Sequence, residues 1–335
     1  MDQLAPGNPF YNVPCAMRLN FPLQTAVLER ALNEIVRRHE SLRTAIVTME
    51  GQPLQRIYPA LALPLTVTDL SALPPVEREA EAQRLAVEEA RRSFDLTEAP
   101  LLRVGVLRLG AAEWVLLLTM HHIVSDGWST GLLFEELTTL YGAFATGRRS
   151  PLPELPIQYA DFAIWQREWL AGTVLEEQVS YWRERLADVP MLQLPTDRPR
   201  PAVQSFRGAY YRFSIPARLD AGLRALARER GVTLFMLLLA GFEVLLARYS
   251  GQDDLVVGTP IANRNRAEFE KLIGFFANTL VLRTDVSGDP PFLELLERVK
   301  QTALGAYAHQ DLPFEMLVEK LHPHRDLSRN PLFQV

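Results

Sequence analysis

The sequence predicts a mixed α/β protein built from two lobes. The chain has 335 residues, which is more than one hydrophobic core usually organises. Strand-like and helix-like segments occur together in both halves, as in layered α/β sandwiches. The stretch "PLPELP" (151–156) has three prolines in six residues and resembles a linker. We therefore expect one lobe over residues 1–155 and a second over residues 156–335.

The composition is that of a soluble globular protein. Hydrophobic residues make up 48% and charged residues 22%, with a formal net charge of −5 and no Lys/Arg block, so a nucleic-acid-binding surface is not expected. The single Cys15 excludes an intrachain disulfide and favours a reducing, cytoplasmic location. No signal peptide opens the chain. The longest apolar run (233–249) contains Glu243 and falls short of the roughly 20 residues of a membrane span, so it predicts a core helix.

Hydrophobic periodicity and turn residues define the elements of the first lobe. They are a strand at 13–19, a helix at 22–40, a hairpin turning near Gly51, a helix at 76–93, two strands within 101–120 joined by a Gly-Ala-Ala turn, and a helix after Asp126. Pro22 suits the first turn of its helix. The second strand of the pair is apolar nearly throughout, which is typical of a strand covered on both faces.

The second lobe repeats this mixture of elements. They are a helix at 160–187, a strand at 207–215, helices at 218–230 and 233–249, strands at 254–260 and near 278–286, and helices to about residue 321. The final "SRNPLFQV" is typical of the opening of a strand, and the first fourteen residues have loop-like composition. Both ends therefore indicate a piece of a longer polypeptide.

The stretch "WVLLLTMHHIVSDGWST" (114–130) combines an apolar strand with His121, His122, Asp126 and Gly127. Successive strand residues face opposite sides, so only one imidazole can enter a given pocket. Gly127 permits a tight turn with a positive φ. An aspartate in such a turn needs a cation or several N–H donors.

Several functions are compatible with this pattern. The histidines and Asp126 could simply cap a strand and a helix. His122 and Asp126 could share a metal ion with His39 or His309, although no Cys pair or HExxH motif supports this. No G-x-S-x-G elbow or nucleotide-binding glycine pattern is present, and Cys15 lies far from any histidine in sequence. The remaining alternative is a histidine acting on a nucleophile that a substrate supplies, which points to group transfer.

Six ordered motifs resemble those of the condensation domains of nonribosomal peptide synthetases. They are "RRHESLRT" (37–44), "MHHIVSDGWS" (120–129), "YADFAIWQ" (159–166), "IGFFANTLVLR" (273–283), "HQDLPFE" (309–315) and "RDLSRNPLFQ" (325–334). The resemblance covers essentially the whole chain. It implies a chloramphenicol acetyltransferase-like fold, with two sandwich lobes arranged as a V around a tunnel. It also implies that a first segment precedes residue 1 and that part of the second lobe follows residue 335.

The resemblance further implies peptide-bond formation in the biosynthesis of secondary metabolites such as antibiotics. The α-amine of an acceptor amino acid attacks the thioester of a donor aminoacyl or peptidyl group. Donor and acceptor peptidyl carrier proteins deliver both substrates on phosphopantetheine arms, an adenylation domain is adjacent, and the chain itself binds no cofactor. The sequence "SDGWS" (125–129) resembles the corresponding sequence of domains that join two L-configured residues. We expect no nucleic-acid or membrane partner.

The roles of the site residues follow from the same resemblance. His122 acts as a base or positions the amine, and His121 orients the loop. Gly127 either offers an N–H to the oxyanion or is a plain turn glycine. Asp126 pairs with Arg264, with Arg43 and Arg283 as rival partners. Trp128, Ser129, Asn278 and Thr279 are assigned to the tunnel, and a structural alternative stays open for each. Trp128 could be a packing anchor, Ser129 could cap the next helix rather than bond the pantetheine arm, and Asn278 and Thr279 could cap strand ends. We expect structural roles for Tyr159, Asp161 and Trp165 at the lobe junction and for His309, Gln310 and Asp311 at a helix start.

Two rival functions stay open. One is a free-standing acyltransferase that uses coenzyme A with the same histidine. The other is a non-catalytic domain that docks carrier proteins and keeps the fold as a binding platform.

Overall fold

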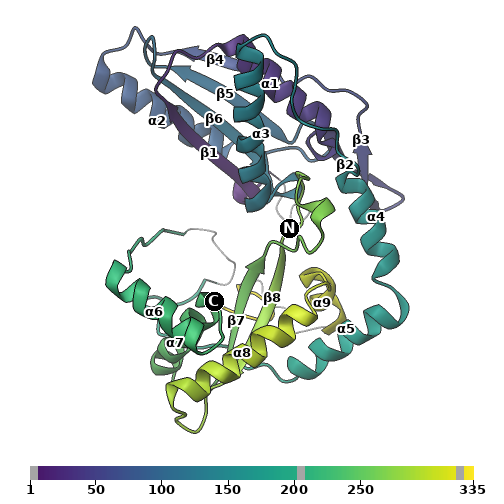
Figure 1. The fold of residues 1–335 in the computed structure, drawn as a ribbon, viewed down its shortest axis with the longest axis vertical. Helices are drawn as coiled ribbons and strands as arrows, with labels where there is room; N and C mark the ends of the chain where they lie inside the picture. Colours follow the sequence, from purple (N-terminus) through teal and green to yellow (C-terminus); the bar gives the residue numbers. More distant parts are fainter. Residues whose placement is uncertain (1–6, 202–207, 322–327) are drawn as a thin grey trace. The chain divides into compact units, whose positions relative to one another are not determined.

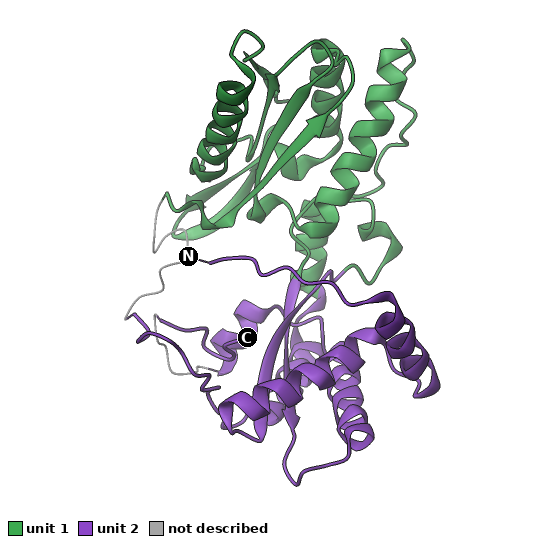
Figure 2. Ribbon diagram, turned by 90° about the vertical axis from the view of Figure 1, so that its left-hand side faces the viewer, with its two compact units in different colours: residues 1–168, 264–277 green, residues 169–263, 278–335 purple. Residues whose placement is uncertain are grey.

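The computed structural model describes residues 7–201, 208–321 and 328–335. It forms two compact units (Figure 2): unit 1 comprises residues 1–168 and 264–277, and unit 2 comprises residues 169–263 and 278–335. The expected boundary after residue 155 differs from this division. The reason is the helix at Tyr159–Trp169, whose Phe162 packs in one cluster with Phe269 and Phe276 of the second stretch of unit 1. We call residues 264–277 the inserted segment.

Unit 1 contains the whole of the predicted first lobe, residues 1–155, together with residues 156–168 and the inserted segment (Figure 1). Its elements are η1 (Pro9–Tyr11), β1 (Asn12–Leu19), α1 (Thr25–Arg38), η2 (Glu40–Arg43), β2 (Thr44–Met49), β3 (Gln52–Ile57), β4 (Thr66–Asp69), α2 (Pro75–Arg91), β5 (Leu102–Arg108), β6 (Trp114–His121), η3 (His122–Val124), α3 (Gly127–Ala145), α4 (Tyr159–Trp169, which crosses into unit 2) and η4 (Ala267–Phe269).

The main sheet of unit 1 has the strand order β1-β6-β5-β4, with β6 antiparallel to both of its neighbours and β4 parallel to β5. Every side chain of β6 is buried. Leu116 and Leu118 pack with α1 and α3, whereas Val115 and Leu117 face α2 (Figure 1). The prediction of a strand covered on both faces is therefore confirmed. This arrangement places the two histidines at the end of a rigid central strand.

Unit 2 packs helices around a two-stranded antiparallel sheet. Its elements are α5 (Gly172–Arg185), α6 (Ala217–Glu229), α7 (Leu234–Ser250), β7 (Asp254–Ile261), β8 (Asn278–Asp285), α8 (Phe292–Ala308) and α9 (Phe314–Leu321). Leu255 of β7 and Leu282 of β8 lie in a core with Leu237 of α7 and Val299 of α8. Helices α6 to α9 and both strands occur where the sequence predicts them.

Two predicted elements of the second half are wrong. The single helix at 160–187 is broken between α4 and α5, where Gly172 adopts a left-handed φ of 54°. The strand at 207–215 is not formed by its described residues 208–215, although their aromatic and polar residues suit a strand. Tyr210 is 96% exposed there, and in the described chain this stretch adopts no regular structure. Aromatic patterning alone forms no strand without a partner strand to complete its hydrogen bonds.

Smaller differences concern local boundaries. Pro22 lies ahead of α1, which begins at Thr25 with Gln24 as its N-cap residue. The end of the chain forms no strand, although Val335 accepts a hydrogen bond from the Gly258 N–H of β7 at 2.8 Å. The short strand β4 has no counterpart among the predicted elements, because four residues give little periodicity. Part of the motif at 325–334 and residues 1–6 lie outside the described residues.

No single helix in the described ranges is long and apolar enough to cross a membrane. Among the described residues, one pair of helices, α6 and α7, would together be long and apolar enough to cross a membrane, but they are bent by 107° at their junction.

The buried face of α7 carries Glu243, the acidic residue that interrupts the longest apolar run. Its Oε1 accepts a hydrogen bond from Thr284 Oγ1 of β8 at 2.9 Å. Its Oε2 is buried without a hydrogen-bond partner among the described residues. Burial raises the pKa of Glu243 to about 7, because an ionised carboxylate here would lose its hydration. The carboxyl group is therefore neutral in the folded protein below that pH.

Replacing Glu243 by glutamine is expected to stabilise unit 2 at high pH and to leave it nearly unchanged at pH 5. The carboxyl pKa is about 7 when folded and near 4.5 when unfolded, so wild-type stability falls as the pH rises between these values. The full difference corresponds to roughly 3 kcal/mol and persists above pH 7. Urea unfolding at pH 5 and pH 9 measures it. The exposed Glu176→Gln variant should show no such pH dependence, and an equal effect of Glu243→Gln at both pH values would contradict the prediction.

Candidate active site

The central strand β6 ends in His121, which is buried against the rings of Phe94 and Tyr11. Its Nδ1 accepts a hydrogen bond from the Ile123 N–H at 3.1 Å and so caps the short helix η3. A ring engaged in this way holds the turn after the strand. This is the orienting contact that the sequence predicts for His121.

His122 opens η3 and is half-buried. Its ring meets Phe275 of the inserted segment edge to face, with 5.0 Å between ring centroids. Its Nδ1 is buried and has no hydrogen-bond partner within the described part of the chain. His122 is thus the histidine that the fold leaves uncommitted, next to the N-terminus of α3.

Asp126 is the N-cap residue of α3 and is only 2% exposed. Its carboxylate accepts hydrogen bonds from the Ser129 N–H at 2.8 Å and the Phe276 N–H at 3.0 Å. It also forms the expected ion pair with Arg264, at 3.2 and 3.4 Å. These donors satisfy the carboxylate without a metal ion.

The two rival arginines are engaged elsewhere. Arg43 donates to the Tyr58 carbonyl and to Glu40 at 3.3 Å. Arg283 forms a bidentate ion pair with Asp254 in unit 2, with a shortest distance of 2.6 Å. Neither arginine contributes to the site around Asp126.

Arg264 organises the inserted segment around its own side chain. The side chain of Arg264 is 1% exposed, and its guanidinium group donates to the carbonyls of Phe269 and Leu272, the latter at 2.7 Å. It also lies over the ring of Phe276, 4.1 Å from the centroid. Burial lowers the pKa of Arg264, and the neighbouring Asp126 opposes this effect. The ion pair therefore ties the loop after β6 to a stretch of chain that follows much later in sequence.

Two residues of the predicted tunnel bind the inserted segment instead. Ser129 is fully buried, and its hydroxyl donates to the Gly274 carbonyl at 2.8 Å while accepting from the Gly274 N–H and from Arg264. These three bonds use the hydrogen-bonding capacity of the hydroxyl within the protein, so they favour a structural role for Ser129 over a bond to a pantetheine arm. Trp128 is 48% exposed, and its indole N–H donates to the Glu270 carbonyl at 2.9 Å.

Gly127 does not form the predicted left-handed turn. It is the first residue of α3, and its φ lies outside the left-handed region. A Cβ at this position would meet no atom within 4 Å, so space is open on this side of the helix. The first N–H groups of a helix have no partner within the helix and carry partial positive charge. Gly127 therefore remains suited to face a developing anion.

The residues expected at the lobe junction pack within unit 1. Tyr159 donates its hydroxyl to the Phe275 carbonyl at 2.8 Å, and burial raises its pKa to about 12. Trp165 packs on Phe269, 5.6 Å between centroids. Asp161 accepts from the Gln158 N–H at the start of α4. Two of the three thus hold the inserted segment, and all three have structural contacts.

Replacing Gly274 by alanine is expected to destabilise unit 1 by about 1–3 kcal/mol, the usual cost of overpacking. A Cβ would lie 2.2 Å from a ring atom of Tyr159, whose hydroxyl is held by the Phe275 carbonyl. The ring therefore cannot move aside freely. Chemical unfolding measures the loss. Gly142→Ala in α3, where a Cβ meets nothing, is the matched control. Equal stability of Gly274→Ala and wild type would contradict the packing described.

The other two tunnel candidates lie in unit 2. Asn278 donates to the carbonyls of Gln310 and Leu312, both at 2.9 Å, and accepts from the Phe314 N–H. Its amide therefore fixes the turn before α9, which favours the capping alternative for Asn278. Thr279 pairs with Pro260 in the sheet.

The two supplementary histidines of the metal hypothesis are also engaged. His309 bonds the Gly305 carbonyl at 2.8 Å and stacks on Tyr181. Its contacts are structural as expected, but it follows the end of α8 rather than opening a helix. His39 bonds Glu136 and Ile273. Across the described residues, no group of three or more His, Cys, Asp or Glu side chains is arranged to hold a metal ion.

Sequence reasoning did not identify two features of the site. One is Phe275, which contacts His122. The other is the buried group of Arg38, His39 and Glu136, which lies behind the inserted segment. The motifs "RRHESLRT" and "IGFFANTLVLR" contain most of these residues, but a motif does not say which residues touch.

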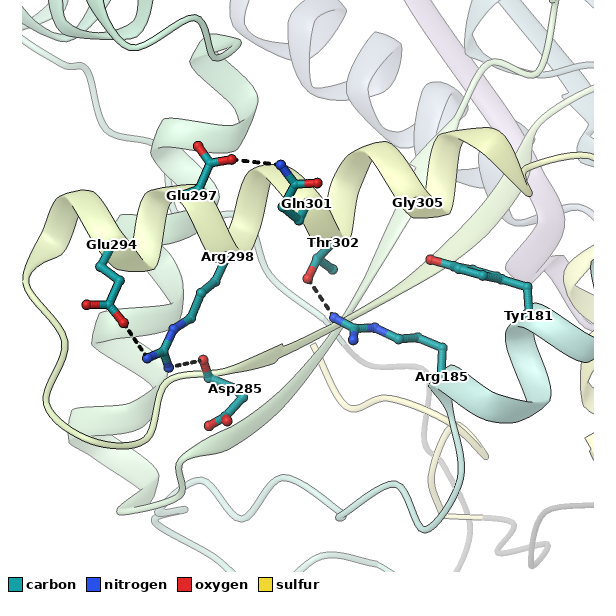
Figure 3. A pocket seen from close by; sticks show the side chains of 9 residues that line it. All are labelled: Tyr181, Arg185, Asp285, Glu294, Glu297, Arg298, Gln301, Thr302 and Gly305. Atoms are coloured by element: carbon teal, nitrogen blue, oxygen red, sulfur yellow. Dashed lines mark hydrogen bonds and ion pairs between the residues drawn. The ribbon is translucent and has the colours of Figure 1, made fainter.

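A pocket of about 550 Å³ lies in unit 2 between α5, α8 and the end of β8 (Figure 3). Arg298 bonds Glu294 and the Asp285 carbonyl, and Arg185 bonds Thr302, so its charged groups are paired with one another or with polar neighbours (Figure 3). None of the predicted site residues lines it. We therefore assign the candidate site to the loop after β6.

Comparisons with known proteins agree on one family. A family model described as "Condensation domain" matches residues 1–335. The chain is 53% identical over 336 residues to one of the linear gramicidin synthase proteins of Brevibacillus parabrevis, covering 100% of this chain and 4% of that protein. It is 50% identical to phosphinothricin tripeptide synthetase PhsC of Streptomyces viridochromogenes, covering 100% of this chain and 31% of that protein. The chain thus spans only a small part of these relatives.

Solved structures give the same result. The X-domain in a complex with OxyB from teicoplanin biosynthesis matches with a TM-score of 0.88 and 34% identity, covering 97% of this chain and 71% of that one. The four-domain nonribosomal peptide synthetase AB3403, bound to AMP and glycine, matches with a TM-score of 0.86 and 26% identity over 99% of this chain and 25% of that one. The first condensation domain of the calcium-dependent antibiotic synthetase matches with a TM-score of 0.76 and 27% identity over 96% and 75%.

Proposed function

Because this chain belongs to the condensation-domain family of nonribosomal peptide synthetases, we propose that it forms a peptide bond between two carrier-bound amino acids. The observation that carries this proposal is His122. The ring stands at the end of a rigid strand, beside the N-terminus of α3, and is not engaged by the neighbouring Asp126. Transfer to an incoming amine requires alignment and proton transfer, and it requires no nucleophile from the protein.

The proposed reaction is an acyl transfer. The acceptor amine attacks the thioester carbonyl, a C–N bond forms, and the C–S bond breaks to release the thiol of the donor arm. A free α-amine has a pKa of about 7.7–8.0, so a useful share is already neutral at pH 7. His122 either removes the proton that the amine loses on attack or positions the amine for attack. The thiolate leaving group takes up a proton in turn.

The N-terminus of α3 supports the same chemistry. The tetrahedral intermediate carries a negative charge on the former carbonyl oxygen. The N–H of Gly127 and the positive end of the helix suit such an oxyanion. The open space beside Gly127 leaves room for a substrate to approach its backbone closely.

The proposed partners are two peptidyl carrier proteins, which present donor and acceptor on phosphopantetheine, and an adjacent adenylation domain. The relatives are synthases of gramicidin and of phosphinothricin tripeptide, and one matching structure is a four-domain synthetase. We propose the L-to-L subtype from the "SDGWS" wording at 125–129. No cofactor of the chain's own is needed for the reaction.

The test is direct conversion of loaded carriers. The chain is mixed with donor and acceptor carrier proteins bearing a pool of L-aminoacyl groups, and dipeptidyl-carrier products are identified by mass spectrometry. An N-acetylated acceptor is the control, because it has no free amine. A parallel reaction with D-aminoacyl donors tests the subtype, and a faster reaction of these donors would overturn it. Absence of any dipeptidyl product would overturn the proposed activity.

Two rival functions give different outcomes in this assay. Acyl transfer from aminoacyl-coenzyme A without any carrier protein would indicate a coenzyme A-dependent acyltransferase. One structure similar to this chain is an X-domain in complex with OxyB. The second rival is the non-catalytic docking domain. Such a domain would bind a carrier protein without converting it, and its affinity for the carrier would be the same in wild type and in His122→Ala.

A further inference from the structure

We propose that His39 is a positioning residue that holds the inserted segment, and through it Phe275, against the imidazole of His122. The inference rests on the proposed function, since it assigns His39 a part in the same reaction. The side chain of His39 is 1% exposed, and its hydrogen bonds go to Glu136 of α3 and to the inserted segment. It therefore acts on the loop after β6 only through other residues.

The contacts of His39 fix its tautomer. The residue follows the last turn of α1, and its Nδ1 accepts a hydrogen bond from the Ile273 N–H at 3.2 Å. Its Nε2 lies 3.1 Å from Oε2 of Glu136. A nitrogen that accepts from an N–H carries no proton, so the proton of the neutral ring is on Nε2 and is donated to Glu136. A proton on Nδ1 would instead oppose the Ile273 N–H.

Glu136 stays ionised, so its carboxylate can accept the hydrogen bond from the Nε2–H of His39. Arg38 binds it in a bidentate ion pair at 3.1 Å and also donates to the Pro153 carbonyl at 2.7 Å. Burial alone would raise the pKa of Glu136, but the hydrogen bonds from His39 and Arg38 outweigh it and hold this pKa below the ordinary value. The carboxylate thereby orients the ring of His39, as an outer carboxylate orients a metal-bound histidine.

The effect reaches the active loop through consecutive residues of the inserted segment. Ile273 is held at both backbone groups, by His39 at its N–H and by the Ser41 hydroxyl at its carbonyl, 2.7 Å away. Two residues further on, the ring of Phe275 meets His122. A displacement of Ile273 would therefore move the ring that packs against the proposed reacting group.

Two variants separate the two hydrogen bonds of His39. Asparagine places its amide oxygen near the position of Nδ1, so His39→Asn keeps an acceptor for the Ile273 N–H and loses the bond to Glu136. Glutamine reaches the position of Nε2, so His39→Gln keeps a donor to Glu136 and loses the acceptor for Ile273. Each variant loses one buried hydrogen bond, and both are expected to lower thermal stability to a similar extent.

The expected activities differ. His39→Gln should lower kcat about 10- to 100-fold with little change in KM for the loaded carriers, because misplaced catalytic geometry acts on the chemical step. His39→Asn should retain most of the wild-type kcat. A loss of kcat that follows stability alone, equal in both variants, would overturn the positioning role.

The tautomer of His39 can also be measured on the wild-type chain, so this test does not require that the variants fold. Nitrogen-15 NMR of the histidine side chains should show His39 as the Nε2–H tautomer, and an Nδ1–H or mixed tautomer would overturn the inference. His122→Ala in the carrier assay separates the two hypotheses. An active His122→Ala contradicts the role of His122 and the inference with it. An inactive His122→Ala with equal His39 variants contradicts the inference alone.

Discussion

Replacing His122 by alanine is expected to lower the rate of peptide-bond formation 10²- to 10⁴-fold, the range typical of a lost general acid–base group. The melting temperature should change little. The ring is only half-buried, its Nδ1 forms no hydrogen bond with described residues, and its aromatic contact is with Phe275. The reaction of loaded carriers measures the rate, and calorimetry measures the melting temperature.

His121→Ala is the matched control for this variant. His121 caps η3 and packs between two aromatic rings, so its loss should lower stability. We therefore expect opposite results from the two variants: His122→Ala should lose activity, and His121→Ala should lose stability. Near-wild-type turnover by a folded His122→Ala variant would contradict the assignment of His122.

Asp126→Ala is expected to destabilise unit 1 by about 3–5 kcal/mol, the usual cost of removing one partner of a buried ion pair. The variant leaves the guanidinium of Arg264 buried without its anion. It also removes the cap of α3 and the acceptor of the Phe276 N–H. Activity should be lost as a consequence. Urea unfolding measures the change, together with carrier conversion at temperatures where the variant is still folded.

The control for this prediction is Asp161→Ala. Asp161 also accepts a backbone N–H near the start of a helix, but it is exposed, whereas Asp126 is buried against a cation. Its loss should cost about 1 kcal/mol, as for an ordinary helix cap. If Asp126→Ala keeps its stability and is nevertheless inactive, then Asp126 acts in the chemistry rather than in the architecture of the loop.

Local patterns predicted most elements of the fold. The apolar strand β6, the amphipathic helix α1 and the hairpin at Gly51 each follow from residues close together in sequence. The prediction of a strand at 207–215 is wrong for its described residues 208–215. A strand needs a partner strand, and that partner can lie anywhere in the chain, so local patterns do not reveal it. The break between α4 and α5 depends on one glycine conformation, which periodicity does not report.

The sequence predicted which types of residue form the candidate site, but it predicted only some of the contacts between them. The Asp126–Arg264 pair agrees with the prediction that followed from the family resemblance. Ser129 and Asn278 were each predicted either to line the tunnel or to cap an element, and the polar groups of both bind the protein's own backbone. Which polar side chains remain open to a ligand depends on distant residues such as Gly274, and no short motif contains that information.

The inserted segment has a consequence for how the polypeptide matures on the ribosome. Arg264 follows Asp126 by 138 positions, so the nascent chain exposes the carboxylate well before its cation has been translated. At about 5–20 residues per second, this delay lasts on the order of ten seconds. The same dependence applies to chimeras with related domains, because a crossover near residue 168 would pair Asp126 with an arginine segment from the other parent. Chimeras that exchange residues 1–168 together with 264–277 keep the pair native.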